Sequence, residues 1–148
     1  MKEYKVEILL IEDNPDEADL AIRSLRENNL ANNLVHIDDG AEALDYIYSK
    51  GKYAGSALSH YPKLILLDLN LPKISGLEIL RRLKSDEATK MIPIVVLTSS
   101  TEQRDIIDSY KLGVNSYIVK PVNFDSFSKA IAELKMYWLV LNQPPEYE

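Results

Sequence analysis

The stretch LILLDLNLP, residues 64–72, decides how this chain folds. Four apolar residues in a row stop at Asp68, and an unbroken apolar run of this kind is typical of a strand covered on both faces in a parallel sheet. Three more runs end in the same way, at Glu12 and Asp13, at Thr98, and at Lys120. Ligands bind beyond the carboxyl ends of parallel strands. We therefore expect these side chains to converge in one acidic pocket with a single lysine.

Strands and helices are expected to alternate along the chain. The predicted elements are strand Val6–Ile11, helix Pro15–Asn28, strand Leu34–Ile37, helix Ala41–Ser49, strand Leu64–Leu67, helix Leu77–Lys84, strand Ile92–Leu97, helix Thr101–Leu112, strand Ser116–Val119 and helix Phe124–Leu141. This alternation predicts an α/β fold, a doubly wound three-layer sandwich with a five-stranded parallel sheet and five helices. We expect a single domain over residues 1–141 that ends in an extended helix, followed by a flexible tail over residues 142–148.

Capping signals support several of these element ends. Asn14 suits the start of the first helix, and Gly113 stands where the fourth helix would need a left-handed residue to end. Ser99 and Glu102 have the spacing of a capping box at the start of that helix. Residues 51–62 exceed the usual length of a connection, and we expect a surface loop or a short helix there.

Composition excludes several classes of function. A chain of 148 residues suits one domain, and the absence of cysteine excludes disulfides, a thiolate nucleophile and cysteine-based metal sites. A net charge of −6 without a basic cluster argues against a nucleic-acid partner. No stretch approaches the roughly 20 apolar residues of a membrane span. The N-terminus is interpreted as a first strand and not as a signal peptide, so the expected location is cytoplasmic.

Three acids are expected to meet at the pocket. Taken alone, Glu12 and Asp13 could equally be turn or capping residues. Beside Asp68 they would raise one another's pKa unless a cation neutralised them. A hard divalent ion fits this need, because Mg²⁺ takes oxygen ligands and keeps waters that a phosphate can displace.

The remaining pocket residues suit phosphoryl transfer. A carboxylate such as Asp68 can accept a phosphoryl group to give an acyl phosphate. That reaction needs alignment and neutralisation of charge, which Mg²⁺ and Lys120 would supply. Thr98 could donate a hydrogen bond to a phosphoryl oxygen, although by itself it could simply cap a helix. Lys120 precedes Pro121, which favours an extended backbone that could aim the ammonium into the pocket.

The order of these residues along the chain closely resembles the receiver domain of two-component response regulators, the CheY-like family. The resemblance spans about residues 6–141 and rests on Glu12-Asp13, Asp68 in LLDLNLP, Gly76, Thr98 in VLTSS, and Lys120-Pro121. It implies the strand order 2-1-3-4-5. It also implies a protein that promotes only its own phosphorylation and dephosphorylation, and is not an enzyme acting on other substrates.

The resemblance also implies a role for each site residue. Asp68 would be the phosphoacceptor, and Mg²⁺ would be bound by Asp68, directly by Asp13, by the backbone carbonyl of Asn70, and by Glu12 through water. Many members of the family have aspartate where this chain has Glu12, which leaves that water-mediated contact open.

Three further residues complete the expected set. Lys120 would pair with Asp68 or with the phosphoryl group, while Thr98 closes on a phosphoryl oxygen and Tyr117 moves inward with it. His36 and His60 stand outside every motif. The phosphohistidine must therefore come from a separate sensor histidine kinase or phosphotransfer protein.

The C-terminal part of the sequence points to a narrower branch and to a partner surface. LILLDLNLP, VVLTSS, GVNSYIVKPVNF and MYWLVL resemble the receivers associated with phytochrome-type photosensory kinases. Residues 136–141 are six apolar residues in a row and surround the helix end, more than one buried face can cover. We therefore predict a homodimer through the last helix and its neighbouring helix, strand and loop, to which Ile106, Ile107, Tyr110 and Tyr117 contribute. The alternative is that the helix end folds onto the body of the domain.

Other functions fit the residues less well. A phosphatase of the haloacid dehalogenase type also uses a strand-end aspartate with Mg²⁺, but it needs a second aspartate where this chain has Asn70. A flavodoxin-like carrier would want a Ser/Thr/Gly-rich phosphate loop after the first strand, where this chain has acids. A transcription factor would need a segment that folds as a DNA-binding domain, and none is left over.

Overall fold

The computed structural model describes residues 8–27, 33–54, 62–120 and 129. Within these residues five parallel strands form one sheet in the order β2-β1-β3-β4-β5. The strands are β1 (Ile8–Ile11), β2 (Leu34–Ile37), β3 (Leu64–Leu67), β4 (Ile94–Thr98) and β5 (Ser116–Val119). The predicted fold class and strand order are confirmed.

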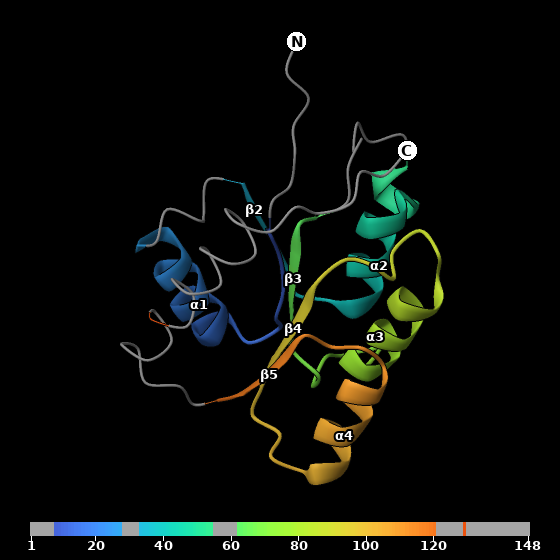
Figure 1. Ribbon diagram of the computed structural model, residues 1–148. Helices are drawn as coiled ribbons and strands as arrows, with labels where there is room; N and C mark the ends of the chain where they lie inside the picture. Colours follow the sequence, from blue (N-terminus) through green and yellow to red (C-terminus); the bar gives the residue numbers. More distant parts are fainter. Residues whose placement is uncertain (1–7, 28–32, 55–61, 121–128, 130–148) are drawn as a thin grey trace.

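Helices cover both faces of this sheet, as the alternation predicted. They are α1 (Pro15–Glu27), α2 (Gly40–Tyr48), α3 (Gly76–Ser85) and α4 (Gln103–Lys111). Helix α1 lies on one face, and α2, α3 and α4 lie on the other (Figure 1). The fifth predicted helix, Phe124–Leu141, and the predicted tail lie outside the described residues. No helix within the described ranges is long and apolar enough to cross a membrane.

The two central strands explain why their sequences are continuous apolar runs. Every residue of β1 and β3 is buried. Along β1, Leu9 and Ile11 pack into the cluster beneath α2 and α3, while Ile8 and Leu10 pack into the cluster beneath α1. Because neither face of these strands meets water, the alternation of polar and apolar residues that marks a half-exposed strand is absent.

Most element ends agree with the expected capping, and one does not. The Asn14 side chain accepts hydrogen bonds from the backbone N–H groups of residues 16 and 17, and Gly113 has a φ of 101°. The predicted capping box of Ser99 and Glu102 is wrong, since Glu102 occupies the N-cap of α4 without a side-chain cap. Instead, the Ser100 hydroxyl lies 2.6 Å from Asp105 Oδ2 and accepts from the Glu102 N–H at 3.4 Å. The hydroxyl one residue later thus contacts the N-cap residue and the first turn of the helix.

Two connections also differ from the expectation. Strand β4 begins two residues later than predicted, because the Ile92 N–H bonds to the Thr89 carbonyl and Pro93 has no N–H to donate. The long segment after α2 begins with a 3₁₀ turn over Gly51–Tyr53, and residues 55–61 lie outside the described part.

Gly76 brings α3 close to the end of β3. A Cβ atom on this residue would lie 2.2 Å from the Asp68 carbonyl oxygen and 2.5 Å from the Leu69 Cα. The Gly76 N–H donates to the Leu69 carbonyl at 2.9 Å. Only glycine permits this approach, which sets the backbone that carries Asp68.

Candidate functional site

Two acids stand side by side where β1 and β3 end. The strands pair in parallel with Ile11 opposite Leu67, so the residues that follow, Glu12 and Asp68, become neighbours. The Asp68 N–H donates to the Ile11 carbonyl at 3.0 Å, which extends the ladder to the site itself. Glu12 is 2% exposed and Asp68 is 5% exposed. Two carboxyl groups are therefore held close together and largely out of water.

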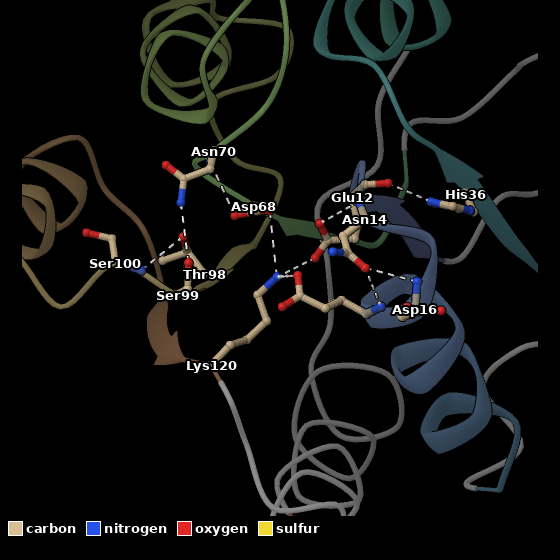
Figure 2. A network of polar contacts seen from close by, with 11 residues as sticks. Glu12, Asn14, Asp16, His36, Asp68, Asn70, Thr98, Ser99, Ser100 and Lys120 are labelled. Carbon is tan, nitrogen blue, oxygen red and sulfur yellow. Dashed lines mark hydrogen bonds and ion pairs between the residues drawn. The ribbon is translucent and has the colours of Figure 1, made fainter.

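Lys120 reaches this pair from the end of β5. Its Nζ lies 2.5 Å from Glu12 Oε1, 2.6 Å from Glu17 Oε2 and 3.6 Å from Asp68 Oδ2. Figure 2 shows the ammonium pointing toward Glu12 and Asp68. The backbone N–H of Lys120 donates to the Thr98 carbonyl at 2.7 Å, which anchors the residue beside β4. The predicted convergence of Asp68, Glu12 and Lys120 is thus what the fold produces.

Burial sets the charge state of this group. It raises the pKa of the Glu12 carboxyl to about 7, with a contribution from the hydrogen bond to Asp68, against the lowering effect of Lys120. Burial lowers the pKa of the Lys120 ammonium, but its hydrogen bonds to Glu12 and Glu17 outweigh that effect and leave the pKa raised. The lysine is therefore charged at neutral pH. The Glu12 carboxyl loses its proton at a pH close to neutral.

The donor set fits a hard divalent cation. One carboxylate oxygen from each of Glu12, Glu17 and Asp68 lies within 4.8 Å of the others. Oxygen ligands are what Mg²⁺ and Mn²⁺ prefer, and the three carboxyl groups supply them around a single ammonium. Asp13, the predicted direct ligand, is exposed and is not part of this cluster, so its role stays a prediction. The Asn70 N–H donates to Asp68 Oδ1 at 3.2 Å, which places that residue beside the acid.

The hydroxyl at the end of β4 is linked to the loop that follows it. Thr98 is fully buried, and its Oγ1 accepts a hydrogen bond from the Ser100 N–H at 3.4 Å. The Tyr117 hydroxyl donates to the Ser100 carbonyl at 3.0 Å. Asn70 Nδ2 lies 3.5 Å from Ser99 Oγ on the other side of the loop (Figure 2). The β4–α4 loop is therefore in contact with the residues around Asp68 and with β5.

Glu17 and His36 were not among the predicted site residues. Glu17 precedes the buried residues Ala21 and Ser24 by one and two helical turns, a spacing that could have placed it on the inner face of α1. His36 Nε2 lies 2.8 Å from the Glu12 carbonyl oxygen, so it carries the proton and donates it (Figure 2). No signal in the sequence indicates that contact, because β2 meets β1 only in the folded sheet.

Comparisons with known proteins agree with this geometry. The family model described as "Response regulator receiver domain" matches residues 8–132. The chain is 39% identical over 138 residues to the probable methanogenesis regulatory protein FilR2 of Methanothrix harundinacea, covering 93% of this chain and 86% of that protein.

Two solved structures are close to it as well. The phosphorylated cyanobacterial phytochrome response regulator RcpA is 38% identical with a TM-score of 0.83, covering 98% of this chain and all of that one. The Mn²⁺-bound form of response regulator Rcp1, a Synechocystis protein, is 37% identical with a TM-score of 0.81, covering 94% of this chain and 98% of that one.

Proposed function

The chain belongs to the response regulator receiver domain family, and on that premise we propose that Asp68 accepts a phosphoryl group from a phosphohistidine. The observation that carries this proposal is the meeting of Asp68, Glu12 and Lys120 at the carboxyl end of the sheet. FilR2 and Rcp1 are matched over 86% and 88% of their lengths. We propose that this receiver acts as a single-domain response regulator.

The reaction forms one bond and breaks another. A carboxylate oxygen of Asp68 attacks the phosphorus, the P–N bond to the histidine breaks as the new P–O bond forms, and the released imidazole takes up a proton. Lys120 offsets the negative charge on the phosphoryl oxygens. The Thr98 hydroxyl accepts from the Ser100 N–H, and its own hydrogen can donate to a phosphoryl oxygen.

The proposed site includes a divalent cation. Bound Mg²⁺ neutralises the acids and the incoming phosphoryl oxygens. We propose that Asp13, Asp68 and the Asn70 carbonyl hold it, with Glu12 acting through water. Support comes from the cluster of carboxylate oxygens of Glu12, Glu17 and Asp68 and from the Mn²⁺-bound form of Rcp1.

We propose that phosphorylation switches a surface built by α4, β5 and the fifth predicted helix, which lies outside the described residues. When Thr98 turns toward the phosphoryl group, its bond to the Ser100 N–H is disturbed, and the Tyr117 hydrogen bond to the same residue with it. Ile107 and Tyr110 are about half exposed on α4. We include in the proposal a homodimer through this surface, to which Ile106 and Tyr117 would add.

The proposal also names the phosphodonor and the class of activity. A separate sensor histidine kinase or phosphotransfer protein supplies the group, and the likeness to a phytochrome response regulator supports a phytochrome-type kinase. Because such kinases use ATP, the receiver would work in the cytoplasm. No nucleic acid takes part. Turnover of free phosphoesters is not proposed, since Asn70 stands where a phosphatase of the haloacid dehalogenase type has its acid/base aspartate.

Acetyl phosphate with Mg²⁺, followed by intact mass spectrometry, tests this function. One phosphoryl group should appear on the wild type and on Asp16→Asn, an exposed acid that serves as the matched control. None should appear on Asp68→Asn or after chelation of the metal. A phosphoryl group that persists on Asp68→Asn would show that the acceptor is wrongly assigned.

A further inference from the structure

Glu17 shares the Lys120 ammonium with Glu12. The Nζ atom is 2.6 Å from Glu17 Oε2 and 2.5 Å from Glu12 Oε1, both within hydrogen-bond length. Its distance to Asp68 Oδ2 is 3.6 Å, which is an ion pair but not a hydrogen bond. The Lys120 ammonium is therefore hydrogen-bonded to both glutamates. It lies farther from Asp68, the proposed phosphoacceptor, than from either of them.

Both ends of the new contact are fixed by the backbone. The Asn14 side chain accepts from the Glu17 N–H at 3.0 Å, so the first turn of α1 presents Glu17 at a set position. Ala18, the next residue, is buried against the sheet and fixes the rotation of that turn. On the other side, the Lys120 N–H bonds to the Thr98 carbonyl. The side chains thus meet because two strand ends and one helix end are held together.

The two glutamates differ in what they can do. The Glu12 side chain is 3% exposed, whereas the Glu17 side chain is 39% exposed. Glu12 sits beside Asp68 at the end of a central strand and keeps the lysine within the pocket. Glu17 is more exposed and bonds to the same ammonium, so a phosphoryl group must compete with it for Lys120.

We infer that Glu17 is a positioning residue for Lys120, holding its ammonium away from Asp68 in the unphosphorylated protein. This inference rests on the proposed function of Asp68 and Lys120. It predicts that the ammonium must leave Glu17 before it can bind the phosphoryl group. Removing the Glu17 charge should therefore make Lys120 more available for the reaction.

The first test measures Lys120 itself and needs no phosphorylation. The ¹³Cε and ¹⁵Nζ signals of Lys120, assigned by their loss in Lys120→Arg, are recorded in metal-free full-length protein by NMR. Glu17→Gln should shift these signals, while Asp16→Asn, which removes the same charge from the same helical turn, should leave them in place. Unchanged Lys120 signals in Glu17→Gln would overturn the inference even if Asp68 is the phosphoacceptor.

The second test measures the reaction at saturating Mg²⁺. Glu17→Gln should be phosphorylated by acetyl phosphate about threefold faster than wild type, the size expected for a half-exposed ion pair, and Asp16→Asn should match wild type. An equal or slower rate would contradict the inference. A Mg²⁺ affinity more than about tenfold weaker in Glu17→Gln than in Asp16→Asn would show instead that Glu17 is a metal ligand. Loss of phosphorylation in the wild type would refute the proposed function and leave the NMR test intact.

Discussion

Replacing Gly76 by alanine should damage both the stability of the domain and its reactive site. The added Cβ would lie 2.2 Å from the Asp68 carbonyl oxygen and 2.5 Å from the Leu69 Cα. Both are backbone atoms that cannot rotate away, so α3 and the end of β3 must move apart. Overpacking of this kind costs about 1–3 kcal/mol. Because both contacts are with backbone atoms, we expect the upper end of that range; alanine recovers up to about 1 kcal/mol through the unfolded state, which leaves a net loss of about 2 kcal/mol.

Urea unfolding, monitored by circular dichroism, measures this loss. Gly113→Ala is the matched control, since a Cβ there meets no atom closer than 3.7 Å but the residue has a φ of 101°. That variant should lose stability through backbone strain alone and should keep the wild-type rate of phosphorylation. Gly76→Ala should also be phosphorylated at least about tenfold more slowly, because displaced backbone misaligns Asp68. A Gly76→Ala midpoint equal to that of wild type, with an unchanged m-value, would refute the steric argument.

Three other perturbations have defined outcomes. Because the pKa of Glu12 is raised, the folded, metal-free protein keeps a proton that the unfolded chain loses above pH 4.5. Its unfolding free energy should therefore fall between pH 4.5 and about 7, by on the order of 3 kcal/mol. Urea titrations in chelator should show this slope in wild type and a flatter one in Glu12→Gln; equal slopes would contradict the assignment. Lys120→Met leaves the buried acids without their cation, and at pH 7.5 without metal it should lower the unfolding free energy by up to about 3 kcal/mol, with part of the loss restored by Mg²⁺. The affinity of the proposed dimer should fall at least about tenfold in the double variant Ile107→Ser, Tyr110→Ser, because both side chains are exposed on α4. Sedimentation in both phosphorylation states measures this. Wild-type protein that stays monomeric at high concentration in both states would rule the dimer out.

The residues of the central strands carried most of the information about the fold. Strands buried on both faces have no polar positions, so LILL at residues 64–67 and ILLI at residues 8–11 could be recognised from the sequence. The polar residue that follows each run had to lie at the carboxyl edge of a parallel sheet. Asp68, Glu12 and Lys120 were identified in this way, and the structure brings them together.

Local hydrogen bonding was harder to predict from spacing. Ser99 and Glu102 have the right separation for a capping box, but the Ser100 hydroxyl contacts Asp105 and the Glu102 N–H instead. Several hydroxyl groups in a row compete for the same helix end, and spacing alone does not select among them.

The sequence by itself determined that acids and one lysine would meet at the edge of the sheet, because apolar runs define the strand ends. Only the tertiary structure decided which acids turn toward that lysine. Glu17 and Lys120 are 103 positions apart, and their contact depends on how α1 and β5 sit across β1 and β3. Asp13 lies beside Glu12 in the chain but is exposed, while Glu17, in the first turn of α1, contacts Lys120. A helix turns its residues through about 100° each, so the position of α1 on the sheet turns Glu17 toward Lys120 and leaves its neighbour Asp16 exposed.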